Sequence, residues 1–201
     1  MRIGLDFDNT IVTYDSLFHK VATEQGLVPA SLPVSKLAVR DYLREAGQDA
    51  VFTELQGDVY GARMGEAEAF AGVFDFIRQA SVRGAELLII SHKTRYPFKG
   101  PQHDLHAAAT GWIDGTLRAA TGKDAVQAVY FEPTKEAKIA RIADCGCDYF
   151  IDDLPEILRM PGFPPQTVRL LFDPEGNHAA TSEFTRLSGW PGIRAFFEER
   201  W

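Results

Sequence analysis

The 201-residue sequence has little cysteine, and Cys145 and Cys147 are the only two. One intervening residue is too tight a spacing for an ordinary disulfide, and two cysteines do not make a disulfide framework. A zinc site would need further ligands, with His103 and His106 as candidates, but the spacing matches no recognised zinc motif. We therefore predict two buried thiols ahead of a strand.

The sequence also lacks an excess of positive charge and any long apolar run. Its 21 Lys and Arg stand against 28 Asp and Glu, and the net charge of -7 argues against binding nucleic acid through phosphate contacts. No stretch is long enough for a transmembrane helix, and an apolar strand occupies the place of a signal peptide. These absences predict a cytoplasmic protein without nucleic-acid or membrane partners. The length suits one core with a small added subdomain.

Two aspartates follow the first apolar segment. Ile3, Leu5 and Phe7 predict a strand, and Asp6 and Asp8 lie at its end. Because strand side chains alternate between faces, both carboxylates should project from one side at the carboxyl end, where open parallel sheets bind ligands. Two like charges this close require a cation or a proton, and Mg2+ prefers oxygen ligands. For such a pair alone, a solvated surface turn is the alternative.

A second acidic pair follows a later apolar run. Residues 149–151 lead into Asp152 and Asp153, and Pro155 enforces a sharp exit. Adjacent carboxylates point in different directions, so one should bind the metal directly and the other more weakly or through water. Two acids capping the next helix are the alternative. The predicted Mg2+ ligands are Asp6, Asp8, Asp152 and Asp153.

Apolar runs alternate with helical segments along most of the chain, which predicts a three-layer, Rossmann-like α/β fold with a mainly parallel sheet. Further core strands are expected at 86–90, 126–131 and 167–172, and a closing helix after Trp190. Residues 14–83 differ, because helical periodicity is interrupted there by glycines, among them Gly57. We predict a small, mostly helical insert at 14–83 and a core formed by 1–13 and 84–201. For part of the insert, the alternative is that it forms the first crossover helix of the core.

The segment Asp6–Phe7–Asp8–Asn9–Thr10 resembles the first motif, Asp-x-Asp-x-Thr, of the haloacid-dehalogenase-like (HAD) superfamily. The resemblance implies that Asp6 is a nucleophile that forms an aspartyl-phosphate and that Asp8 is the general acid/base. It also assigns Asn9 and Thr10 to the substrate site and makes the insert a type 1 cap. Most members are phosphatases, and the dehalogenases typically lack the second aspartate.

Three later segments resemble the remaining motifs in the same order. Ser91 ends a strand and matches the hydroxyl residue that binds the phosphoryl group, and Asp152–Asp153 matches the acidic fourth motif. The third motif is a lysine that neutralises the nucleophile and the phosphoryl oxygens. We predict Lys135, in the first helical turn after the N-cap Thr134, rather than Lys138 one turn further.

Basic residues follow Ser91 directly in this acidic protein. His92, Lys93 and Arg95 are predicted to bind an anionic substrate, and a solvated charged loop is the alternative.

The resemblance therefore implies a Mg2+-dependent phosphatase that hydrolyses a small phosphorylated metabolite through an aspartyl-phosphate. One alternative is a catalytically silent phosphoryl-binding or scaffolding protein on the same fold, which an assay with an aryl phosphate would distinguish. The other is a phosphomutase or nucleotidase of the same superfamily.

Overall fold

The computed structural model describes residues 1–201 and divides the chain into two compact units. One unit comprises residues 1–11, 69–93 and 114–201, and the other comprises 12–68 and 94–113. The division differs from the predicted one in three places, the smallest of which is residues 12–13, which belong to the helical unit. Residues 69–83 belong to the unit that holds the sheet, because helix α4 packs on strand β4, and residues 94–113 belong to the helical unit.

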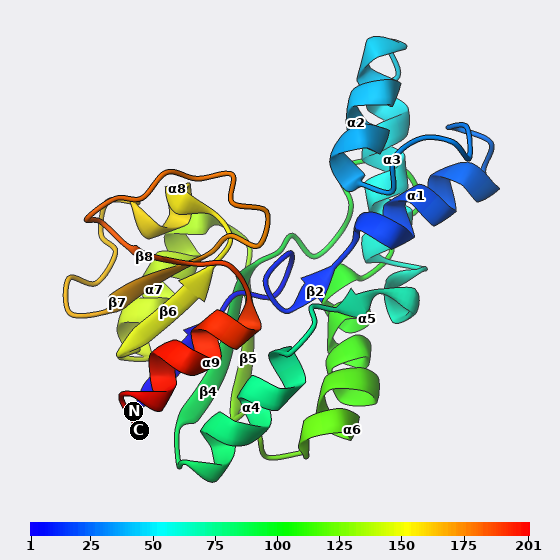
Figure 1. The fold of residues 1–201 in the computed structure, drawn as a ribbon. Coiled ribbons are helices and arrows are strands. Elements are labelled where there is room, and N and C mark those ends of the chain that lie inside the picture. The colour runs from blue at the N-terminus through cyan, green and yellow to red at the C-terminus, as the bar shows by residue number, and fades with distance from the viewer. The chain divides into compact units, whose positions relative to one another are not determined.

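A six-stranded sheet forms the centre of the first unit, and every neighbouring pair of strands is parallel (Figure 1). The α/β fold with a parallel sheet is thereby confirmed. In spatial order the strands are β5 (Ala128–Glu132), β4 (Glu86–His92), β1 (Arg2–Leu5), β6 (Tyr149–Asp152), β7 (Val168–Phe172) and β8 (Thr185–Leu187). The edge strand β8 was not predicted, because three residues are too few to show a period.

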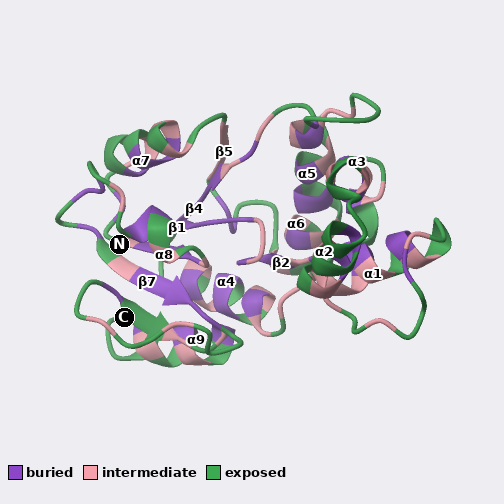
Figure 2. Cartoon of the chain, turned by 90° about the horizontal axis from the view of Figure 1, so that it is seen from above, coloured by how far each residue is buried: buried purple, intermediate pink, exposed green.

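Helices cover both faces of this sheet. The helices α7 (Lys135–Asp144) and α8 (Pro155–Leu158) pack on one face, where Ile139 and Phe150 share a buried cluster. The helices α4 (Val73–Val82) and α9 (Trp190–Glu198) cover the other, and the rings of Phe76 and Trp190 lie 5.2 Å apart. Figure 2 shows the strands between α7 on one side and α4 and α9 on the other. Burial on both faces explains why the strands are continuously apolar.

Strand β1 lies between β4 and β6, so Asp6 directly follows a central strand. Gly4 of β1 pairs in register with Phe150 of β6. A Cβ atom at Gly4 would lie 2.8 Å from Cε2 of Phe150, closer than van der Waals contact permits. Glycine at this position therefore makes room for the Phe150 ring against the centre of the sheet.

The second unit is mainly helical, as predicted for most of its length. Its elements are α1 (Asp15–Glu24), α2 (Lys36–Glu45), α3 (Asp49–Tyr60), the short 3-10 helix η1 (Met64–Glu66) and α5 (Leu105–Trp112). Aromatic packing joins α1 to α3, with the Phe18 and Phe52 rings 5.8 Å apart. The expected break at Gly57 is wrong, because α3 runs through it. A Cβ atom there would lie 3.0 Å from that of Pro97, so glycine permits the close approach of this segment.

Four short elements lie close to the points where the chain passes from one unit to the other. They are β2 (Val12–Thr13), β3 (Glu68–Ala69), the π-helical turn η2 (Ile113–Leu117) and α6 (Arg118–Thr121). Strands β2 and β3 pair as a two-stranded sheet. No helix combines the length and the apolar character required to cross a bilayer.

Candidate active site

Three neighbouring strands bring polar side chains together at their carboxyl ends. Ser91 lies near the end of β4, Asp6 follows β1, and Asp152 ends β6. All three residues are buried, and the Ser91 hydroxyl donates a hydrogen bond of 2.9 Å to Oδ1 of Asp6. The predicted convergence of Asp6, Ser91 and Asp152 is thus present in the structure.

Lys138 is the cation at this site. Its Nζ lies 2.6 Å from Oδ1 of Asp6 and 2.6 Å from Oδ2 of Asp152, and its side chain is 2% exposed. Burial alone would lower the pKa of Lys138, but the charges of Asp152 and Asp6 outweigh it and raise that pKa. Lys138 therefore carries a positive charge between the two carboxylates.

The preference for Lys135 does not agree with this geometry. Lys135 forms a solvent-exposed ion pair with Glu156. Helix α7 packs on β4 and β5 through the face that carries Lys138, Ile139 and Ile142, and Lys135 lies on the same face one turn earlier, at the first residue of the helix. Lys135 and Lys138 both have helical spacing with the two isoleucines, so the sequence carried no signal that separated them.

Three carboxylates form a group suited to a metal ion. One oxygen each from Asp6, Asp152 and Asp153 lies within 4.8 Å of the others. Leu154 N–H donates to Oδ1 of Asp152 (2.9 Å), and the Thr10 hydroxyl donates to Oδ1 of Asp153 (3.4 Å). These contacts orient the side chains of Asp152 and Asp153, and one oxygen of each lies close to an oxygen of Asp6.

The charge of this group matches a divalent cation. With Lys138 as the one ammonium among the three carboxylates, a net charge of two minus remains. Burial, and next the charge of Asp6, raise the pKa of Asp153 well above its usual range. Burial likewise raises the pKa of Asp152 to about 6, although Lys138 opposes this. The residues therefore fit Mg2+, whose charge would relieve this repulsion and which prefers hard oxygen donors.

Asp8 has a different partner from the one predicted. Its two carboxylate oxygens lie 2.7 and 3.0 Å from Nζ of Lys93, and the Lys93 side chain is 4% exposed. The three-carboxylate group does not include Asp8, so the expectation that its side chain binds the metal is not met. Lys93, predicted to bind substrate, instead orients Asp8.

A small cavity with a volume of about 80 Å³ opens at these side chains. Asn9 and His92 line it together with Asp6, Asp8 and Lys138, so these predicted substrate-binding residues lie beside the candidate nucleophile. Asn9 adopts a positive φ of 58°, which asparagine tolerates better than most residues. Arg95 lies in the helical unit and forms an ion pair of 3.0 Å with Asp104.

One supporting residue was missed. The indole N–H of Trp190 in α9 donates a 3.0 Å hydrogen bond to the carbonyl of Thr10 and so fixes the loop after Asp8. No local pattern connects residues 180 positions apart, so the sequence carried no signal for this contact.

Solved structures with the same arrangement cover nearly the whole chain. A predicted phosphatase from Clostridium acetobutylicum matches with a TM-score of 0.60 at 9% identity, covering 98% of each chain. An L-2-haloacid dehalogenase matches with a TM-score of 0.59 at 10% identity, again covering 98% of each. The chain has the HAD fold. The four motifs thus lie on the fold that they predicted.

A HAD-family hydrolase from Deinococcus radiodurans R1, solved with bound phosphate and sodium, also matches this HAD fold. Its TM-score is 0.57 at 14% identity, covering 98% of this chain and 95% of that one. No known family profile matches the sequence, and no curated protein does. At these identities the similarity concerns the fold, and the chemistry has to be argued from the site.

Proposed function

We propose that the protein is a Mg2+-dependent phosphatase that hydrolyses a small phosphate monoester through an aspartyl-phosphate at Asp6. The observation that carries this proposal is the pairing of two aspartates with separate lysines. Asp6 is held by Lys138, and Asp8, two residues on, is held by Lys93. A dehalogenase needs a nucleophilic aspartate but has no leaving alkoxide to protonate, so a second, positioned aspartate favours phosphoryl transfer.

In the first step a carboxylate oxygen of Asp6 bonds to phosphorus as the ester P–O bond breaks. Asp8, which must take up a proton before it can act as the acid, gives that proton to the leaving oxygen. In the second step Asp8 takes a proton from water as the water oxygen bonds to phosphorus, which releases phosphate and restores Asp6. Ser91 and Lys138, which contact Asp6, lie where they can also donate to the phosphoryl oxygens. Mg2+ held by Asp6, Asp152 and Asp153 would supply further positive charge at those oxygens.

A small phosphorylated metabolite as substrate and a cytoplasmic location are part of this proposal. The proposal also includes a cap function, which we assign to the helical unit of residues 12–68 and 94–113 rather than to the predicted insert at 14–83.

Release of phosphate from an aryl phosphate in the presence of Mg2+ tests the proposal. Asp6→Asn keeps the size of the side chain but removes the nucleophile, so turnover should be abolished with the fold intact by circular dichroism. Asp144→Asn, at the exposed end of α7, is the matched control and should retain activity. Halide release from a 2-haloacid is measured in parallel. Turnover by Asp6→Asn, or halide release without phosphate release, would contradict the proposal.

A trapped complex locates the nucleophile independently of turnover. With beryllofluoride and Mg2+, the beryllium should bond to a carboxylate oxygen of Asp6. Beryllium bound to Asp152 instead would transfer the nucleophilic role to that residue.

A further inference from the structure

Trp190 connects helix α9 to the turn that follows strand β1. It is the first residue of α9 and is 1% exposed, and its indole N–H donates the 3.0 Å hydrogen bond to the carbonyl of Thr10. Both residues belong to the unit that holds the sheet, so the contact lies within one compact body. Because buried polar groups are costly without partners, this bond satisfies a donor and an acceptor at once.

The turn formed by residues 7–11 carries two parts of the candidate active site. The Ile11 N–H donates to the Phe7 carbonyl (3.0 Å) and closes the turn. Asp8, the proposed acid/base, lies inside it, and the Thr10 hydroxyl donates to Asp153 of the three-carboxylate group (3.4 Å). A shift of the Thr10 backbone would therefore displace the acid/base and also remove a support of the candidate metal ligands.

Contacts from outside the turn hold its conformation. Asn9 has the positive φ of 58° that residues with side chains disfavour, so the turn gains from such contacts. Two of them reach its second half: the Trp190 N–H bonds to the Thr10 carbonyl, and the Phe70 N–H bonds to the Ile11 carbonyl (2.9 Å). Of these two, the Trp190 bond comes from a side chain, so a substitution can remove it.

Aromatic packing fixes the indole in turn. The rings of Phe76 in α4 and Phe172 at the end of β7 lie 5.2 and 5.7 Å from the Trp190 ring. The ring of Phe70 lies 4.8 Å from that of Phe172. Because the interior is closely packed, the indole cannot turn away from Thr10 without opening a gap between these rings.

We infer that Trp190 is a positioning residue of the candidate active site, which sets the place of Asp8 and of the Thr10–Asp153 contact through its bond to the Thr10 carbonyl. It acts through the backbone rather than by contact with the reacting atoms. Its effect on turnover rests on the proposed phosphatase function, whereas its effect on the turn does not.

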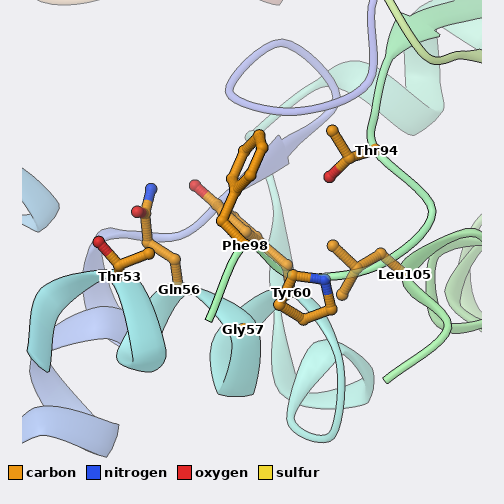
Figure 3. A pocket seen from close by; sticks show the side chains of 8 residues that line it. Thr53, Gln56, Gly57, Tyr60, Thr94, Phe98 and Leu105 are labelled. Atoms are coloured by element: carbon orange, nitrogen blue, oxygen red, sulfur yellow. The ribbon is translucent and has the colours of Figure 1, made fainter. Parts of the chain in front are cut away.

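An aromatic residue of the helical unit provides one control. Figure 3 shows Phe98 at a pocket between α3 and the segment 94–105, which Thr53 and Gln56 also line. No residue of the turn at 7–11 lines this pocket, and Phe98 is 88% exposed. Loss of the Phe98 ring should therefore leave the turn unchanged.

Hydrogen exchange over residues 7–11, measured without metal or substrate, tests the effect on the turn. In Trp190→Phe, which keeps an aromatic ring but lacks the N–H, these amides should exchange about 5-fold faster, the scale expected for loss of one hydrogen bond. Phe197→Leu, at a fully buried ring of the same helix, should lower Tm but leave this exchange unchanged, and Phe98→Ala should leave it unchanged too. Unchanged exchange in Trp190→Phe, or equally faster exchange in all three variants, would overturn the inference.

Steady-state kinetics with an aryl phosphate and Mg2+ test the effect on the reaction. Trp190→Phe should lower kcat about 10-fold with KM little changed, because a displaced acid/base slows the chemical step. Phe197→Leu should keep the parent kcat below its melting temperature, and an equal kcat in both variants would overturn the positioning role. If Trp190→Phe does not fold, benzothienylalanine at position 190, which has sulfur in place of the N–H, replaces it in both measurements.

The two measurements separate failure of this inference from failure of the phosphatase proposal. If the parent hydrolyses no ester, the phosphatase proposal fails. Faster exchange over residues 7–11 in Trp190→Phe alone would then still support the hold of Trp190 on the turn, and unchanged exchange would overturn it.

Discussion

Nζ of Lys93 lies 2.7 and 3.0 Å from the two carboxylate oxygens of Asp8, and the Lys93 side chain is almost fully buried. The Lys93 ammonium fixes the direction of the Asp8 carboxylate and balances its negative charge. Asp8 is thereby paired with a different lysine from Asp6, so the two aspartates, two residues apart, can have different roles.

Replacement of Lys93 should therefore reduce kcat rather than substrate affinity. We expect Lys93→Ala to lower kcat about 100-fold, because Asp8 loses the contact that orients it, and Lys93→Arg to lose less. Lys99→Ala, at a half-exposed lysine further along the same segment, is the control and should stay close to the parent. A rise in KM with kcat unchanged would instead favour substrate binding by Lys93, as the sequence predicted.

Lys138 and Lys135 should differ sharply. Without Lys138, Asp6 and Asp152 lose the cation between them, and breaking a buried ion pair in this way costs about 3–5 kcal/mol. Lys138→Ala should lower both Tm and kcat, kcat by about 1000-fold or more, whereas Lys135→Ala should stay within several-fold. Thermal melts and steady-state kinetics measure both. If Lys138→Ala does not fold, Lys138→Arg supplies the comparison, and a parent-like kcat in either variant would remove Lys138 from the mechanism.

The ionised carboxylate of Asp153 should destabilise the folded protein when metal is removed. Its pKa is raised in the folded state by burial and the charge of Asp6, so above that pKa folding must hold an ionised carboxylate against repulsion. In EDTA, Asp153→Asn should raise Tm by a few °C for each kcal/mol relieved. As the pH falls from the raised pKa of Asp153 toward the ordinary pKa of an aspartate, protonation should progressively remove this difference in Tm.

Added Mg2+ should reverse the ranking, because it stabilises the wild type by binding the folded state and Asp153→Asn lacks one ligand. Asp173→Asn serves as a contrast, since the Asp173 carboxylate accepts amide hydrogen bonds from Asn177 and His178 and its loss should lower Tm in both conditions. A lower Tm of Asp153→Asn in EDTA would contradict the repulsion.

The two thiols should react slowly in the folded protein. Burial raises the pKa of Cys147 to about 12 and also raises the pKa of Cys145. Near pH 8 only on the order of one Cys147 in ten thousand is a thiolate, which is the reactive form. Iodoacetamide labelling followed by mass spectrometry should therefore modify Cys147 only after denaturation. Rapid labelling of Cys147 in the native state would show that the buried thiol is reached without unfolding.

The sequence by itself determined the sheet and the place of the acidic residues. Continuous apolar runs can be buried on both faces only as central parallel strands, and their carboxyl ends must share one edge. For this reason Asp6, Ser91 and Asp152 could be placed together before any contact was known. The helical character of most of 14–83 and the burial of Cys147 follow equally from local pattern.

Only the tertiary structure decided which lysine serves which carboxylate. Both lysines lie on the face of α7 that packs on the sheet, and only the tertiary structure shows that Lys138, one turn into the helix, is buried against Asp6 and Asp152 while Lys135 reaches solvent. The partner of Asp8 likewise depends on the pairing of β1 with β4, which brings Lys93 beside a residue 85 positions earlier. The sequence could not show that 12–68 and 94–113 form one helical unit, because contacts between distant segments leave no period in the sequence.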